Sequence, residues 1–355
     1  MSARGAALTF GVLVALCLIP GPSTASVAQI DLGWGATYQQ LTTPVDGRPV
    51  TFHRLLVDPE RVQPAVAYSS QGIGTTESLL AMTRGANALA GINGNFFDPA
   101  SSLPVGFLLD DRRPLSTPYG TRGTLGIGFF GRLHFLNPQI ELFLETADRN
   151  IPVDGVNRPL LSDGLIVYTP EYRGPMGPVR NKMRTALVRD GRVMRIGTDI
   201  RPIDRDEQLV AATGDAVDRL ESVLPAEPVQ LDYRIEPERY LIRDALQAGP
   251  TLIRDGAFVS VDEGFDESFR TKRAARSAVA RLGDGRLLFT VAEQGGGSHG
   301  VDLRSLAEEL LSLGAEDALA LDGGGSSGLV VRRGVGWRTA GDARDVPVAL
   351  VLRPQ

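Results

Sequence analysis

Short apolar runs separated by Gly, Pro and Asp turns fill most of the chain, and this pattern predicts many β-strands. Asp190-Gly191, which lies between two such runs, is a typical β-hairpin turn. A short helix is expected to begin at Thr75 or Thr76 and to end at Gly85. The strand-length runs before the last third of the chain are residues 50–57, 62–68, 88–92, 106–109, 125–130, 165–168, 185–189, 193–196 and 229–235.

The last hundred residues show the most regular pattern. Residues 277–282 and 286–292 flank a Gly-Asp-Gly turn and predict an antiparallel hairpin. Asp302 then caps a helix with one apolar stripe, and Gly314 ends it. Because a strand at residues 318–321 follows this helix, we expect it to run parallel to the strand that precedes the helix.

Three charged residues are expected at one edge of this sheet. Glu293 and Asp322 follow the ends of the two parallel strands, and the hairpin register places Arg276 opposite Ala292. Ligands of open α/β sheets bind beyond the carboxyl ends of the strands. Asn93 also follows a predicted strand, so it is expected to join the same crevice. The alternative for Glu293 and Arg276 is a surface salt bridge, which contributes only about 0–1 kcal/mol.

Asp322 is followed directly by Gly323, Gly324 and Gly325 and then by Ser326 and Ser327. Three glycines weaken an ordinary strand or helix by roughly 0.5–1 kcal/mol each, but they allow positive φ angles. Backbone N–H groups in such a turn can point into one concavity and bind an anion. An acid beside an anion site suits a reaction in which a phosphate and a reacting carbon are handled together.

The composition excludes several classes of protein. The 355 residues are 43% hydrophobic and 22% charged, with a net charge of −5 and no basic run, so nucleic acid is not an expected partner. The single cysteine, Cys17, lies in the N-terminal segment. The remainder of the chain therefore offers no disulfide, thiol nucleophile or cysteine-ligated zinc.

Residues 1–28 resemble a secretory signal peptide. Arg4 is their only charge, an apolar run of about 14 residues follows, and small residues offer cleavage sites after Ala25 or Ala28. That run is too short to span a bilayer comfortably. We therefore expect a secreted protein with no membrane span after removal of the signal, in which residues 29–85 form strands and a helix packed on a larger domain.

The motifs together resemble the phosphodiester glycosidase family over nearly the whole predicted mature chain. The most specific is the triple-glycine element with its preceding helix. The motifs are Gly91-Ile-Asn-Gly-Asn-Phe-Phe97, Gly249-Pro-Thr-Leu-Ile-Arg-Asp-Gly256, Arg276-Ser-Ala-Val279, Leu313-Gly-Ala315, Leu321-Asp-Gly-Gly-Gly-Ser-Ser327 and Arg344-Asp-Val346. The sequence departs from the family pattern in two places. Ser277 replaces a usual Thr, and Glu293-Gln294-Gly295 replaces a common Asp-Gly-Arg, so its acid is longer by a methylene.

The resemblance implies a catalytic domain over residues 86–355. The expected fold is mixed α/β (α+β), with a central mixed β-sheet flanked by helices, several β-hairpins and long Gly/Pro-rich loops. The expected activity removes a sugar that is joined through its anomeric carbon to a phosphodiester. A phosphorylated glycan or sugar-1-phosphodiester is then the expected substrate. Whether the reaction retains or inverts the anomeric configuration depends on the distance between the two carboxylates.

On this reading each candidate residue has a role. Asp322 or Glu293 would stabilise the reacting carbon or activate water, and Arg276 would bind the phosphate. The sequence identifies no certain cofactor; a divalent cation is possible, with Asp98 as the candidate metal ligand or else a turn cap. His53 and His134 are expected to be structural. The substrate-binding candidates are Asn93, Asn95, Gly323, Gly324, Gly325, Ser326, Ser327 and His299.

Other functions were weighed against this one. Gly324-Gly-Ser-Ser-Gly328 also fits the nucleophile elbow of serine hydrolases, but a strand follows the serines and no histidine follows His299. A Walker phosphate loop is excluded because no Gly-Lys-Ser/Thr is present. The stronger alternative is a secreted protein that binds a phosphorylated glycan without cleaving it.

Overall fold

The computed structural model describes residues 28–236, 241–260, 262–341 and 343–355, and residues 1–27 of the predicted signal lie outside this part of the chain. The chain is mostly β-structure, with 50% strand and 10% helix. Both element types occur, as expected, but the predicted central sheet flanked by helices is wrong. Because most apolar runs are short and end at Gly, Pro or Asp, they form strands of several separate sheets.

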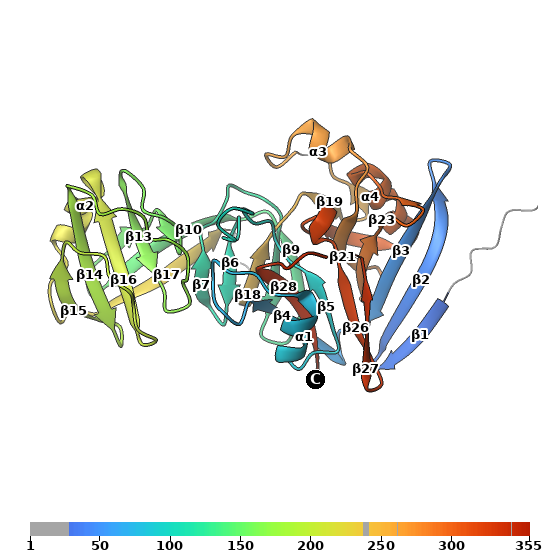
Figure 1. Ribbon diagram of the computed structural model, residues 1–355, viewed down its shortest axis with the longest axis horizontal. Helices are drawn as coiled ribbons and strands as arrows, with labels where there is room; N and C mark the ends of the chain where they lie inside the picture. Colours follow the sequence, from blue (N-terminus) through green and yellow to red (C-terminus); the bar gives the residue numbers. More distant parts are fainter. Residues whose placement is uncertain (1–27, 237–240, 261, 342) are drawn as a thin grey trace, which may run out of the picture.

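The largest sheet has eight strands and carries the predicted hairpin near its middle (Figure 1). The strands that end before Glu293 and Asp322, β22 and β25, are both antiparallel to β21 and therefore parallel to each other, as expected. They are not neighbours, because β21 lies between them. The order is β1 (Ala28–Gly33), β2 (Ala36–Val45), β3 (Arg48–Val57), β22 (Leu287–Ala292), β21 (Arg276–Leu282), β25 (Ala315–Ala320), β19 (Thr251–Arg254) and β20 (Ala257–Phe258).

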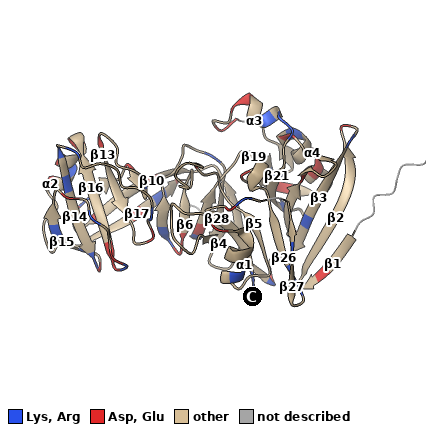
Figure 2. Ribbon diagram, in the orientation of Figure 1, with Lys and Arg blue, Asp and Glu red and all other residues tan. Residues whose placement is uncertain are grey.

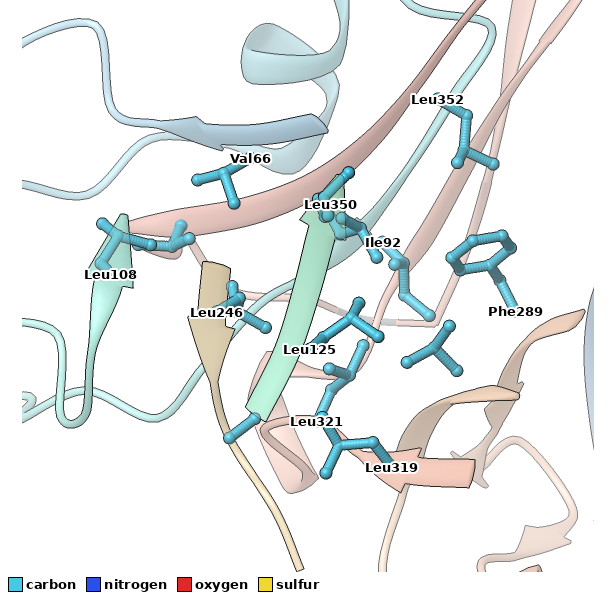
Figure 3. Close-up of a cluster of buried hydrophobic side chains, with 14 of the residues drawn as sticks. Val66, Ile92, Leu108, Leu125, Leu246, Phe289, Leu319, Leu321, Leu350 and Leu352 are labelled. Carbon is cyan, nitrogen blue, oxygen red and sulfur yellow. The ribbon is translucent and has the colours of Figure 1, made fainter. Parts of the chain in front are cut away.

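Two antiparallel five-stranded sheets pack with the first. One has the order β27 (Gly336–Ala340), β26 (Leu329–Arg333), β5 (Ala90–Asn93), β28 (Val348–Pro354) and β4 (Val62–Tyr68). The other has the order β7 (Arg113–Ser116), β6 (Leu108–Asp110), β18 (Ile242–Gln247), β8 (Thr124–Gly128) and β9 (Leu133–Leu136). Side chains of all three sheets meet in one core, where Phe289, Leu350 and Leu125 are fully buried (Figure 3).

A distal lobe extends from this body and is drawn in green and yellow in Figure 1. Its core includes Leu165, Val210 and Leu231 and is continuous with Leu109 and Ala245 of the adjoining body sheet. One sheet has the order β12 (Gly155–Val156), β13 (Gly164–Tyr168), β16 (Glu207–Thr213), β14 (Met183–Arg189) and β15 (Arg192–Gly197). The other has the order β11 (Asn150–Pro152), β10 (Gln139–Thr146) and β17 (Val229–Glu236), and η1 (Gly214–Ala216) and α2 (Val217–Glu221) complete the lobe.

Helix α4 (Leu303–Ser312) covers one face of the largest sheet, and the prediction of its ends is confirmed. Asp302 is the N-cap and accepts a hydrogen bond from the Ser305 N–H at 2.7 Å. Alanines on β21 and β25, among them Ala278 and Ala318, pack beneath the helix. Their small side chains leave room for a close approach.

Helix α1 (Leu79–Gly85) ends where predicted but begins later. Ser78, rather than Thr75 or Thr76, is its N-cap and accepts from the Ala81 N–H. The Thr75 hydroxyl instead donates to the backbone of the preceding turn. The remaining short elements are α3 (Glu267–Thr271), η2 (Gly324–Ser326) and the hairpin strands β23 (Gln294–Gly295) and β24 (Ser298–His299).

Residues 28–85 share sheets with the C-terminal part of the chain. Strand β3 pairs with β22 over six residues, from Leu287↔Val57 to Ala292↔Phe52, and β4 pairs with β28. Acidic and basic residues are interspersed along both the body and the distal lobe (Figure 2). Among the described residues, no helix is long and apolar enough to cross a membrane.

A candidate carboxylate site beside the triple-glycine loop

The sheet edge predicted from the sequence, at which β22 and β25 end, is present. Arg276 pairs with Ala292 across the hairpin, as predicted, and Ala278 pairs with Ala320 on the other side. Strand β21 therefore begins where β22 and β25 end. Glu293 and Asp322 follow those two ends on either side of β21.

A hollow of about 380 Å³ lies at this edge. One wall is the end of β22 with the β23 turn, and the other is the triple-glycine loop. It is lined by Ala275, Val291, Glu293, Gln294, Gly295, Gly296, Gly324, Gly325, Ser327 and Gly341. Glu293 thus joins the glycine loop at one hollow, whereas Asp322 and Arg276 do not line it. Larger hollows of about 420 and 540 Å³ lie elsewhere, beside the strands of the distal lobe.

Glu293 presents a carboxylate to this hollow while one of its oxygens is held by the protein. Its side chain is 31% exposed, and Oε1 lies 2.8 Å from Nε2 of the buried His53. The Gly341 N–H donates to the same oxygen at 3.2 Å. His53 was expected to be structural, and its contact with Glu293 was not predicted. The only sequence feature is that His53 and Arg54 are consecutive polar residues inside an apolar strand, and it does not point to Glu293.

Asp322 is buried, with 8% of its surface exposed, next to the loop that it precedes. Burial raises the pKa of Asp322 to about 6, although hydrogen bonds from Ser326 and Gly323 and the charges of Arg344 and Arg276 act in the opposite direction. The Gly323 N–H donates to its Oδ1 at 2.9 Å. A carboxyl group with this pKa can hold or release a proton near neutral pH.

Arg344 is the cation that reaches the loop from the exposed side. Its backbone N–H donates to the Gly325 carbonyl at 2.8 Å, and its Nε donates to the Ser326 hydroxyl oxygen at 3.2 Å. The guanidinium lies 4.7 Å from the centre of the Phe97 ring. Sequence reasoning placed Arg344 in a family motif but assigned it no role. The structure brings it to Ser326 and close to Asp322.

Arg276 is placed differently from the prediction. Its side chain is buried and donates to three backbone carbonyls: Phe269 at 2.6 Å, Lys272 at 2.8 Å and Val301 at 3.4 Å. The guanidinium also lies over the Phe269 ring at 4.6 Å, and burial lowers the pKa of Arg276 to about 10. These contacts tie the segment before β21 to the residues around α3 and α4. The guanidinium of Arg276 therefore stabilises the fold and is not directed at the hollow.

The N–H groups of the triple-glycine loop also serve internal contacts. Besides the Gly323 N–H, the Gly324 N–H donates to the Ala275 carbonyl at 2.8 Å. Those two donors are therefore not free for an anion, contrary to the expected nest. By contrast, the Ser327 hydroxyl is buried and has no hydrogen-bond partner among the described residues. Ser327 also lines the hollow.

Asn93 ties the loop to two strands. Its Nδ2 donates to the Asp322 carbonyl at 2.7 Å, and its Oδ1 accepts from the Gly328 N–H at 3.1 Å and from the Ser277 hydroxyl at 2.7 Å. It is fully buried, so it positions the loop from within. Asn95 donates to the Val105 carbonyl at 3.5 Å, and its Oδ1 has no partner among the described residues.

Asp98 caps a turn. Its carboxylate accepts from the Ala100 N–H at 2.9 Å and from the Ser101 hydroxyl at 2.8 Å, and these bonds lower the pKa of Asp98. Within the described residues, no three His, Cys, Asp or Glu side chains gather in a way that could hold a metal ion. His299 is exposed and pairs with Gln294 in the β23–β24 hairpin at the rim of the hollow.

One family model matches the segment that carries the site. Residues 202–353 match the model described as phosphodiester glycosidase, which confirms the resemblance noted in the sequence over that segment. That segment includes Glu293, Asp322 and Arg344. A search of curated proteins gives no match.

Solved structures share the fold over almost the whole chain. A hypothetical protein from Synechocystis is 23% identical with a TM-score of 0.78 over 93% of this chain, which spans only 64% of that protein. A protein from Burkholderia pseudomallei K96243 is 20% identical with a TM-score of 0.74, covering 94% of this chain and 98% of that one. The catalytic domain of zebrafish N-acetylglucosamine-1-phosphodiester alpha-N-acetylglucosaminidase is 14% identical, with a TM-score of 0.49 over 93% of this chain and 82% of that one. That last similarity supports no conclusion about this chain.

Proposed function

We propose that this protein hydrolyses the bond between the anomeric carbon of a sugar and a phosphodiester, releasing free sugar and a phosphomonoester. One observation carries the proposal. The triple-glycine loop of the family-matching segment forms one wall of a hollow of about 380 Å³, and the opposite wall presents the Glu293 carboxylate. The fold similarity alone would not support an activity.

The chemistry of the leaving group fits such a site. A phosphomonoester has a second pKa of about 6, so it leaves the anomeric carbon far more readily than an alcohol does. Strong protonation of the leaving oxygen is therefore less necessary than in ordinary glycosidases. The site must mainly supply positive charge at the phosphate and a carboxylate at the sugar.

Glu293 is proposed to act at the sugar. Its carboxylate stabilises the oxocarbenium-like carbon or takes a proton from the attacking water. The bond between C1 and the phosphate oxygen breaks, and its electron pair stays on that oxygen. The oxygen and one hydrogen of water form the new hydroxyl at C1. The other proton of water is taken up by Glu293 or by the phosphomonoester. The buried Ser327 hydroxyl, at the same hollow, is the proposed donor to a substrate oxygen.

Arg344 is proposed to bind the phosphate, in place of Arg276, and Ser326 to hold Arg344 at the loop. Arg344 is exposed and lies at the loop, whereas the donors of Arg276 are used by backbone carbonyls. Asp322, whose pKa burial raises to about 6, is then the proposed acid at the leaving oxygen. Its pKa is close to that of the departing phosphomonoester, and proton transfer between groups of matched pKa has little thermodynamic cost.

The test is to incubate the purified protein with a panel of sugar-1-phosphodiesters, with and without a chelator, and to measure free reducing sugar. Wild-type protein is expected to release sugar, and Glu293→Gln is expected to lose at least about 100-fold of the rate. Glu308→Gln is the matched control, because Glu308 is an exposed carboxylate of α4 paired with Arg304. Binding of a phosphodiester without release of sugar, unchanged in Asp322→Asn, would favour the binding protein over the enzyme.

We also propose that the protein is exported. The support is the sequence of residues 1–28, which has a single charge, an apolar run and small residues near its end. Expression of the full chain in a bacterial host followed by N-terminal sequencing of the protein outside the cytoplasm tests this. Cleavage after Ala25 or Ala28 is expected. An uncleaved protein that stays inside the cell would contradict the proposal.

A further inference from the structure

A chain of close polar contacts runs from Glu293 into the interior of the protein. Glu293 Oε1 lies 2.8 Å from His53 Nε2, and His53 Nδ1 lies 2.6 Å from the Tyr38 hydroxyl oxygen. Arg338 Nε donates to that hydroxyl at 3.1 Å, and its Nη2 contacts Oε1 of Gln40. Tyr38 and His53 are 0% and 3% exposed, so water does not compete for these bonds.

Only one arrangement of protons satisfies the whole chain. The Glu293 carboxylate can only accept, so a neutral His53 whose Nε2 lies 2.8 Å from Oε1 carries its proton on Nε2. His53 Nδ1 is then an acceptor for the Tyr38 O–H, and the Tyr38 oxygen accepts from Arg338. Arg338 reaches this chain from the other sheet, since it lies on β27.

Burial keeps the two middle groups uncharged. Burial lowers the pKa of His53, although the neighbouring Glu293 raises it in part. Burial also raises the pKa of Tyr38, against the opposing effect of Arg338. The chain thus places a neutral donor behind the carboxylate, without a second formal charge in contact with it.

We propose that His53, Tyr38 and Arg338 are positioning residues that fix the carboxylate of Glu293. The Gly341 N–H donates to Oε1 and His53 Nε2 lies 2.8 Å from the same oxygen, so Oε2 is the oxygen left for the substrate. A Glu has one more rotatable bond than the Asp common at this point in the family, and the hydrogen bonds remove that freedom before substrate binds. This inference rests on the proposed function, because it assigns Glu293 a reacting oxygen.

The tautomer can be measured without any substrate. The chain has only three histidines, His53, His134 and His299, so their ring signals can be assigned with single substitutions. Two-bond ¹H–¹⁵N spectra of ¹⁵N-labelled protein at pH 7.5 are expected to show His53 neutral with its proton on Nε2. In Tyr38→Phe the partner of Nδ1 is lost, and the ¹⁵N pattern is expected to shift toward the other tautomer or an exchange average. Tyr172→Phe is the matched control, since the Tyr172 hydroxyl donates to the Pro175 carbonyl away from this chain.

Turnover provides the second measurement. Tyr38→Phe and Arg338→Met are expected to lower kcat about 10- to 100-fold with little change in KM, because a misplaced carboxylate slows the reaction more than it weakens binding. Arg338→Lys keeps a donor and is expected to recover part of the loss. Tyr172→Phe is expected to retain wild-type kcat. Thermal unfolding of each variant shows whether a loss reflects folding.

The two measurements separate the possible failures. If His53 carries its proton on Nδ1 or is charged at pH 7.5, the inference is wrong, whatever the activity. It is also wrong if folded Tyr38→Phe turns over like Tyr172→Phe. If wild-type protein releases no sugar while the spectra show the expected tautomer and its loss in Tyr38→Phe, the proposed function fails. The positioning of Glu293 is then upheld by the spectra alone.

Discussion

The Ser277 hydroxyl donates to Oδ1 of Asn93 at 2.7 Å and so joins a strand of the largest sheet to β5 of another. Since Asn93 also holds the glycine loop, we predict that Ser277→Ala lowers the free energy of unfolding by about 1–2 kcal/mol, the usual cost of leaving a buried acceptor with fewer donors. Ser277→Thr keeps the hydroxyl and is expected to be much closer to wild type. Urea denaturation measures both. Equal stability of the two variants would contradict the assigned bond.

Arg276 is predicted to be required for folding more than for phosphate binding. Arg276→Met fills a similar volume but leaves three backbone carbonyls without their donor, so it is expected to lose about 3–5 kcal/mol of unfolding free energy. Arg276→Lys is expected to fall between Met and wild type. Chemical denaturation checks this. A fully stable Arg276→Met that has lost only phosphodiester binding would show that Arg276 acts in substrate binding.

Asp322 is predicted to make the protein less stable as the pH rises. Its pKa is raised from 3.8 to about 6 in the folded state, so between these values the native protein binds more protons than the unfolded chain. The unfolding free energy therefore falls with rising pH in that window, by up to about 3 kcal/mol from this group. Asp322→Asn removes this dependence. Its stability relative to wild type, from urea unfolding, is expected to be higher at pH 7.5 than at pH 4.

The two adjacent glycines of the loop are predicted to respond differently to alanine. A Cβ on Gly325 meets nothing within 4 Å and would extend into the hollow that this residue lines. Gly325→Ala is therefore expected to keep its stability but to raise KM. Gly324 has a φ of +58°, so Gly324→Ala is expected to cost about 1 kcal/mol. Steady-state kinetics with thermal unfolding test the pair, and an unchanged KM in Gly325→Ala would show that substrate does not enter this hollow.

Arg344 is predicted to carry most of the affinity for phosphate. Arg344→Gln is expected to raise KM for a phosphodiester, and the inhibition constant of inorganic phosphate, about tenfold or more, because a charge-assisted hydrogen bond is lost. Arg353→Gln is the control, since Arg353 is an exposed arginine of β28. Both constants are read from initial rates. Similar values in the two variants would exclude Arg344 as the phosphate ligand.

Local patterns were sufficient to predict local structure. Asp302 and Gly314 mark the ends of α4, and the Gly-Asp-Gly turn sets the register that places Arg276 opposite Ala292. The start of α1 was predicted wrongly, because Thr75 and Ser78 are both good caps and the Thr75 hydroxyl is used by the turn that precedes the helix. The helix content was overestimated. The position of β21 between β22 and β25 was also missed, because this strand order leaves no marker in the sequence.

The site was predicted only in part, because a local pattern determines where a residue lies but not where its side chain points. Glu293 and the glycine loop do meet at a hollow, because strand ends and register determine where they lie. The direction of a side chain at a strand end is set by packing, and Arg276 points into the fold rather than into the hollow. His53 could not be separated from a core residue, because its partner Glu293 lies far away in sequence.

Strand β28 lies between β4 and β5, although it comes much later in the chain. The preceding hairpin and loop supply Arg338, the Gly341 N–H and Arg344, which reach groups described above at the site. Such distant pairings are slow to form, because a long loop must close first. A chain that still lacks its C-terminal residues would therefore lack these three contacts, and the site is complete only once β28 has inserted between two strands synthesised much earlier.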